Sequence, residues 1–191
     1  MKKIMMTLAA VLCCAMTTTV FTSCGGGDDD NGNNNQPPVD VAVSAEMKCA
    51  LYTTDESLAA FDFYVKYYDE NGNIQSEKVV WSEQNNSDGQ RVWTKKVVQK
   101  LPATLGVLFE IKAKDGIDLN AQYILSRGYD ITITSWTASG KAIDQHYDSN
   151  YKSNRNRPGM LTDVLRTEGR PLDIILNYNA NGIRVGTSTW Q

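Results

Sequence analysis

Apolar and polar residues alternate with a period of two along most of the chain after residue 40. In the first such segment, every second residue is apolar: Val41, Val43, Ala45, Met47, Cys49 and Leu51. The same alternation recurs over 61–67, 107–113, 117–125 and 129–133. A period of two is typical of strands with one face on a core and the other toward solvent. The pattern therefore predicts a β-rich domain.

Weaker patterns indicate further strands at 74–82, 91–99, 142–147, 172–178 and 183–190, and we expect about nine of these segments to form strands. Residue pairs that tolerate positive φ separate several of these segments and predict tight turns. They are Asn71-Gly72, Asp88-Gly89, Asp115-Gly116, Ser139-Gly140 and Asn181-Gly182. We expect the turn at 115–116 to be a hairpin, because the alternation resumes directly after it.

One segment follows a helical period instead. Its apolar residues fall on one helical face, Pro158 suits a first turn, and Gly169 with Pro171 ends the segment. We predict a short helix at 159–168 that covers an open end of the sheets.

Many short strands at similar spacing favour an antiparallel β-sandwich, with a small β-barrel as the alternative. The passage from Tyr129 to Gly140 resembles a late strand and hairpin of an immunoglobulin-like domain. This resemblance implies an immunoglobulin-like sandwich over 39–191, a length usual for one domain.

The N-terminus predicts export. Lys2 and Lys3 precede an uncharged stretch over 4–21, which is marginal for a bilayer span of about 20 apolar residues. A charged start with a short apolar core indicates a secretory signal peptide over 1–23; a transmembrane anchor is the alternative.

Phe21-Thr22-Ser23-Cys24 resembles the lipobox of Bacteroidota-type surface lipoproteins. The resemblance implies cleavage before Cys24 and attachment of a membrane lipid to its thiol. Residues 24–38 contain almost no apolar side chains and predict a flexible tether. The acidic run at 28–30 resembles the signal for the outer face of the outer membrane, which implies surface display. The periplasmic face is the alternative.

Composition argues against several kinds of chemistry. His146 is the only histidine, and Cys49 is the one thiol left after the leader is removed and Cys24 is lipidated. A two-histidine zinc motif is therefore excluded, and neither a serine-nucleophile elbow nor a phosphate loop is present. We expect no metal, no cofactor and no catalytic residue. Carboxylate pairs meet only in three dimensions, so a small secreted, glycosidase-like hydrolase stays an alternative.

Charge excludes a further class of partner. Lys2 and Lys3 lie in the leader and three of the 22 acidic residues lie in the tether, so the domain is nearly neutral. It has no polybasic field that would attract nucleic acid.

Aromatic residues provide the first candidate binding surface. The strand phases place Tyr52, Tyr64, Tyr68 and Trp136 on outward faces. Exposed rings on a sheet can stack on sugars or anchor a protein partner. The alternative is that these rings form cross-strand pairs that only stabilise the sheets.

A basic segment provides the second candidate. Lys152, Arg155 and Arg157 lie in a polar stretch that we expect to be an exposed loop, suited to an acidic protein or an anionic glycan; a simply solvated loop is the alternative. The sequence thus predicts a lipid-anchored, non-catalytic interaction or glycan-binding module. A fimbrial or adhesin subunit is a further alternative.

Overall fold

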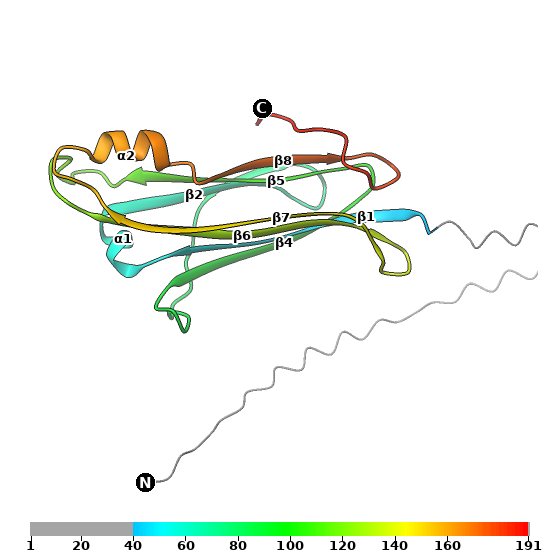
Figure 1. The fold of residues 1–191 in the computed structure, drawn as a ribbon, viewed down its shortest axis with the longest axis horizontal. Helices are drawn as coiled ribbons and strands as arrows, with labels where there is room; N and C mark the ends of the chain where they lie inside the picture. The colour runs from blue at the N-terminus through cyan, green and yellow to red at the C-terminus, as the bar shows by residue number, and fades with distance from the viewer. Residues whose placement is uncertain (1–39, 191) are drawn as a thin grey trace, which may run out of the picture. The chain divides into compact units, whose positions relative to one another are not determined.

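The computed structural model describes residues 40–190, which belong to one compact unit, Pro38–Gln191. They form two antiparallel four-stranded sheets that pack as two layers (Figure 1). Sheet A has the order β4-β1-β6-β7 and sheet B the order β3-β2-β5-β8. The all-β sandwich is confirmed, and the sheets do not close into a barrel. The predicted leader, lipidation site and tether lie outside the described residues.

Sheet A contains β1 (Ala42–Thr53), β4 (Arg91–Lys100), β6 (Ile124–Thr137) and β7 (Ala142–Arg155). Sheet B contains β2 (Phe61–Tyr68), β3 (Ile74–Lys78), β5 (Ala103–Ala113) and β8 (Leu172–Tyr178). Two helices, α1 (Asp55–Ala60) and α2 (Leu161–Glu168), lie at one end of the sandwich (Figure 1). No helix within residues 40–190 has the length and apolar character needed to cross a bilayer.

The core lies between the sheets and is built by the predicted alternation. Phe61, Phe63 and Val65 of β2 are buried, and the Phe63 ring stacks on Phe109 of β5 at 5.8 Å. Opposite them, Met47 and other inward residues of β1 are buried in sheet A. Complete burial of one such side chain contributes about 1.5–3 kcal/mol. This alternation fixes which face of each sheet is covered.

The predicted phase is wrong at the start of β1. Val41 and Val43, expected to face inward, are 56% and 47% exposed, whereas Ala42 is buried. The register with β6 shifts between Ala42 and Ser44, which leaves Val43 as an extra residue. Such a β-bulge places two residues opposite one and reverses the alternation before it.

The hairpin predicted at 115–116 is also absent. Gly116 has φ 80°, but residues 114–123 are irregular and lead from β5 in sheet B to β6 in sheet A. Strand β5 already pairs with β2 on one side and β8 on the other, so no edge is free for a third partner. The segment crosses between layers instead, and eight strands form among the described residues rather than about nine.

Strand β7 is much longer than the predicted 142–147. It continues to Arg155 through residues expected to form a loop. Because β7 pairs only with β6, it is an edge strand, and most of its side chains are exposed. Polar residues are usual on an edge strand, which explains why the hydrophobic pattern missed it.

The predicted helix at 159–168 forms over Leu161–Glu168, with Leu161 buried at its start. Helix α1 was not predicted. Ser57 attaches it to β6, because its Oγ accepts a hydrogen bond from the Ser126 amide at 2.7 Å and donates to the Ile124 carbonyl at 3.0 Å. Six residues are too few to show a helical period in the sequence.

Candidate functional site

The outer face of sheet A carries a cross-strand row of short side chains. Ala50 of β1 pairs with Thr94 of β4 and with Asp130 of β6. Asp130 in turn pairs with Ser149 of β7. Two neighbouring cavities of about 480 Å³ and 350 Å³ lie over this row and share Asp130 in their lining. We call this depression across the strands the groove.

One wall of the groove is aromatic. Tyr52 and Tyr151 both pair with Gly128, which lies between them on β6. A Cβ at Gly128 would lie 2.6 Å from Cδ2 of Tyr151, so the tyrosine ring rests directly on the glycine. The missing side chain at this position therefore lets Tyr151 lie flat against the sheet beside Tyr52.

The opposite wall is formed by Lys48, Thr132 and Tyr147, which make the next row that faces the same way. Tyr147 is 63% exposed. Lys48 donates to Glu46 at 2.8 Å, and Lys96 donates to the other oxygen of Glu46 at 2.7 Å. Partial burial raises the pKa of Glu46, but its bonds to these lysines outweigh that effect and lower the pKa overall.

Asp130 lies at the centre of the groove, bonded to both walls. Its Oδ2 accepts from the Tyr52 hydroxyl at 2.7 Å, and its Oδ1 accepts a long bond from the Tyr147 hydroxyl at 3.4 Å. Partial burial raises the pKa of Tyr52 to about 12, and the hydrogen bond to Asp130 and its charge add to the effect. Each carboxylate oxygen has a further lone pair, so Asp130 can still accept hydrogen bonds from a ligand.

A loop before β4 adds polar groups beside the aromatic wall. Asn86, Asp88 and Gln90 line the larger cavity together with Tyr52 and Tyr151. Asn86 fixes the loop, because its Oδ1 accepts from the amides of Asp88 and Gln90 at 3.0 and 2.9 Å. One open depression is thus lined by two tyrosine rings, two carboxylates and two side-chain amides. They belong to Tyr52, Tyr151, Asp88, Asp130, Asn86 and Gln90.

The structure separates the four aromatic residues predicted from the sequence. Tyr52 and Trp136 lie on the outer face of sheet A, but Trp136 pairs with Ser44, eight residues along β1 and ~26 Å from Tyr52. Tyr64 and Tyr68 belong to β2 in sheet B. The four residues therefore do not form one surface.

The two tyrosines of sheet B have partners within the chain. The Tyr68 ring stacks on Trp190 at 5.3 Å, and Trp190 Nε1 donates to Asp173 at 2.8 Å. Lys112 Nζ lies 4.9 Å from the centre of the Tyr64 ring. Tyr64 thus contacts the neighbouring strand β5, whereas Tyr68 contacts the segment that follows β8.

The predicted basic loop is part of a strand. Lys152 and Arg155 belong to β7, and only Arg157 follows it. Lys152 makes an ion pair with Glu168 of α2, whereas Arg155 and Arg157 are exposed. The three basic side chains do not act as one mobile segment.

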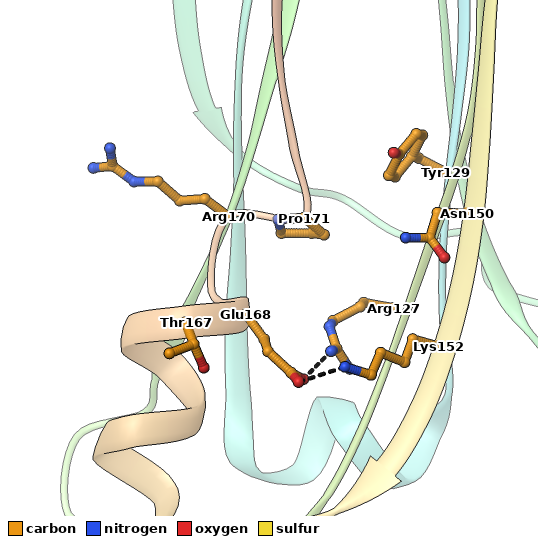
Figure 2. Close-up of a pocket in the computed structure, with 8 residues that line it drawn as sticks. All are labelled: Arg127, Tyr129, Asn150, Lys152, Thr167, Glu168, Arg170 and Pro171. Carbon is orange, nitrogen blue, oxygen red and sulfur yellow. Dashed lines mark hydrogen bonds and ion pairs between the residues drawn. The ribbon is translucent and has the colours of Figure 1, made fainter.

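Glu168 also marks a smaller cavity of about 240 Å³ between β6, β7 and the end of α2. Figure 2 shows Arg127 and Lys152 both bonded to this carboxylate, with Arg170 directed away from the cavity. Burial lowers the pKa of Arg127, whose side chain is only 4% exposed, while Glu168 opposes that shift. Glu168 supplies the counter-charge that this buried cation requires. We therefore assign the cluster to fixing α2 on the sandwich.

The side chains of His146 and Cys49, the two groups considered for catalysis, do not face the groove. The ring of His146 faces Arg184, whose Nη1 is 3.4 Å from Nδ1. Cys49 is buried behind β1, and burial with the charge of Asp130 raises its thiol pKa to about 12. Within residues 40–190, no cluster of histidine, cysteine, aspartate or glutamate side chains could hold a metal ion.

Sequence reasoning missed Asp130, Gly128 and Tyr147 as site residues and placed Tyr151 in a loop. Tyr147 and Tyr151 are four residues apart and would share one face of a strand, which is the only signal that the sequence offers here. Comparison with family models, with curated proteins and with solved structures gives no match.

Proposed function

We propose that this chain is a lipid-anchored protein of the cell surface and that its domain binds a glycan, without catalysis, in the groove on sheet A. The resemblance of Phe21-Thr22-Ser23-Cys24 to a lipobox supports the anchor, and the acidic tether supports surface display. The groove supports the binding activity. The supporting observation is the arrangement of Tyr52 and Tyr151 around Asp130.

This arrangement suits a sugar for two chemical reasons. Tyrosine rings offer a flat apolar surface with a polar edge, against which the C–H face of a sugar ring can stack. Asp130 and the side-chain NH2 group of Gln90 offer hydrogen-bonding groups for sugar hydroxyls, whereas Asn86 is bonded within its loop. A few such groups beside aromatic surface are typical of small-molecule sites.

A protein partner fits the groove less well. The centre of a stable protein interface is usually apolar and poor in charge. Here the centre is a carboxylate, and the hydroxyl side chains of Thr94 and Ser149 lie in the same row. The groove thus favours a hydroxyl-rich ligand over an apolar side chain.

A glycan array tests the binding activity. The full chain is purified in a detergent without a sugar headgroup, because a glycosidic detergent would compete for the groove. We expect the intact protein to bind, and both Tyr151→Ala and Tyr52→Ala to lose about tenfold or more in affinity. Tyr64→Ala removes a tyrosine from the other sheet and is the matched control.

Equal binding by all three variants would contradict a site on sheet A. Cleavage of a bound oligosaccharide, followed by mass spectrometry, would contradict the non-catalytic proposal and favour a hydrolase.

Labelling with a fatty-acid probe tests the anchor. We expect the full chain to incorporate the label and to sediment with membranes, and Cys24→Ser to do neither. Digestion of intact cells by an added protease then tests the membrane face. Protection of the domain until the outer membrane is broken would contradict surface display.

A further inference from the structure

We infer that the groove binds an internal stretch of a linear, uncharged glycan that lies across the strands of sheet A. This inference rests on the proposed glycan-binding function and adds the class of ligand. It follows from the length of the groove, from its ends and from its charge.

The row that forms the floor of the groove crosses all four strands of sheet A. Thr94 lies at one end on β4, and Ser149 lies at the other on β7. Three interstrand spacings give a length of ~14 Å, which is too long for a single sugar ring. Both cavities include Asp130, and between them they reach Thr94 on β4 and Ser149 on β7. The groove therefore offers space for several linked units.

Both ends of the groove are open among the described residues. Strands β4 and β7 are the two edges of sheet A, and Thr94 and Ser149 are exposed. A site that recognises the end of a glycan needs a closed wall to stop the chain. An open groove instead lets the chain continue past each edge of the sheet. The contacts are then made with its internal units.

The two tyrosines of the aromatic wall form an extended surface along the groove. The Cα atoms of Tyr52 on β1 and Tyr151 on β7 are two interstrand spacings apart, which is about 10 Å, and the Tyr151 ring extends over Gly128 toward Tyr52. A chain that lies in the groove can therefore contact this wall with more than one sugar unit, so affinity should depend on chain length.

The negative charge of Asp130 limits which kind of sugar unit can bind above it. The carboxylate is fixed by Tyr52 and Tyr147, and Asp88 brings a second carboxylate to the same cavity. A uronate unit here would meet like charges at short range, and such contacts discriminate strongly against a ligand. At the other end of the groove, Lys48 and Lys96 share the single carboxylate of Glu46, which offsets one of their two positive charges. An uncharged sugar can donate its hydroxyls to Asp130.

Calorimetry on the full chain, in a detergent without a sugar headgroup, tests this inference. The probes are linear glucose, mannose and xylose oligomers from the monosaccharide to the hexasaccharide, with galacturonate oligomers of the same lengths. We expect affinity for one neutral series to rise about tenfold or more with length and then level off. The galacturonates should bind about tenfold more weakly than that series.

Asp130→Asn provides the charge test. The asparagine oxygen can still accept from Tyr52, so this variant keeps the local hydrogen bond while the charge is removed. We expect the difference in affinity, the gap, between neutral and galacturonate oligomers to shrink about tenfold. Asp62→Asn is the matched control, because Asp62 lies on the outer face of sheet B and pairs with Lys78 at 2.9 Å. It should leave the gap unchanged.

The outcomes separate the two proposals. Binding of no oligosaccharide of any length contradicts glycan binding itself. Binding of a monosaccharide as tightly as its hexasaccharide contradicts the extended groove alone. Tighter binding of galacturonates by the unchanged protein contradicts the selection of uncharged chains, and glycan binding stands.

Discussion

The hydroxyl of Tyr52 donates a 2.7 Å hydrogen bond to Oδ2 of Asp130, a residue 78 positions further along the chain. The bond joins β1 to β6 across the groove, so it reports directly on the geometry of the proposed site. The pKa of Tyr52 is about 12, raised first by burial and then by this bond and by the charge of Asp130.

Asp130→Asn should lower the pKa of Tyr52 toward the ordinary tyrosine value of about 10, because the negative charge that opposes phenolate formation is removed. A pH titration of tyrosine ring carbons by NMR measures it. Tyr129 is an internal control, since its pKa of about 12 depends on burial and on Asp148. A Tyr52 pKa that stays at about 12 would show that burial alone sets it.

The domain should lose stability in alkali before its tyrosines ionise in the folded state. Burial is the main cause that raises the pKa values of Tyr52, Tyr129 and Tyr178 to about 12, and a nearby aspartate adds to it in each case. In the unfolded chain tyrosine ionises near about 10, so the unfolded state releases its protons first. The free energy of unfolding therefore falls as pH rises from about 10 to about 12.

Tyr178→Phe should weaken this alkaline loss. The Tyr178 hydroxyl is buried and has no hydrogen-bond partner among the described residues, so its removal costs little at neutral pH. Urea unfolding at a series of pH values measures both effects. If the free energy of unfolding of the variant falls with pH as steeply as that of the unchanged protein, Tyr178 does not contribute to the alkaline loss.

Gly128→Ala should destabilise the domain by about 1–3 kcal/mol, the usual cost of overpacking. The new Cβ would lie 2.6 Å from the Tyr151 ring and 3.1 Å from the Asn150 carbonyl oxygen. In a Tyr151→Ala background the ring clash is absent, so the cost should fall. Urea unfolding of the unchanged protein, the two single variants and the double variant gives the coupling free energy between the two positions. We expect it to be about 1 kcal/mol. Zero coupling would mean that Tyr151 does not rest on the glycine.

Glu168→Gln should cost about 2–3 kcal/mol of stability, because it leaves the buried guanidinium of Arg127 without its counter-charge. The matched control is Asp163→Asn, which removes an exposed ion pair with Arg166 on the same helix. That pair should contribute about 0.5 kcal/mol or less. Thermal and urea unfolding compare the two variants, and equal losses would contradict the assignment of Glu168 to fixing α2.

The Cys49 thiol should resist alkylation in the folded protein at pH values near neutrality. Burial and the charge of Asp130 raise its pKa to about 12, so almost no thiolate forms. Peptide mapping after iodoacetamide treatment measures alkylation at Cys49 separately from the other cysteines. Unfolding in urea should make Cys49 reactive. Ser149→Cys places a thiol at an exposed position on the same sheet and is expected to react without denaturant.

The sequence by itself determined the class of fold and most of the strands. The alternation over 61–67 fixed both the position and the inward face of β2, because one face of that strand is buried throughout. Gly72 and Gly140, with φ of 79° and 84°, form turns where the pairs Asn71-Gly72 and Ser139-Gly140 predicted them. These features depend on neighbours in the chain, so local pattern is enough to find them.

The tertiary structure decided what local pattern does not contain. The polar edge strand β7 has no hydrophobic period, and the bulge at Val43 exists only through the register with β6. The alternation over 117–125 became a crossing between sheets because both edges of β5 were already paired.

The groove depends on tertiary structure in the same way. Tyr52 was identified from its outward phase, but nothing local to it indicates Asp130 or Tyr151. Pairing of β1, β6 and β7 brings these three residues into adjacent rows. Strand register is a long-range property, set by the burial of one face of each sheet, and the sequence of one segment does not reveal its partner. The sequence therefore placed Tyr52 on an outward strand face, and only the packed sheet brought Tyr151 beside it to form the wall of a site.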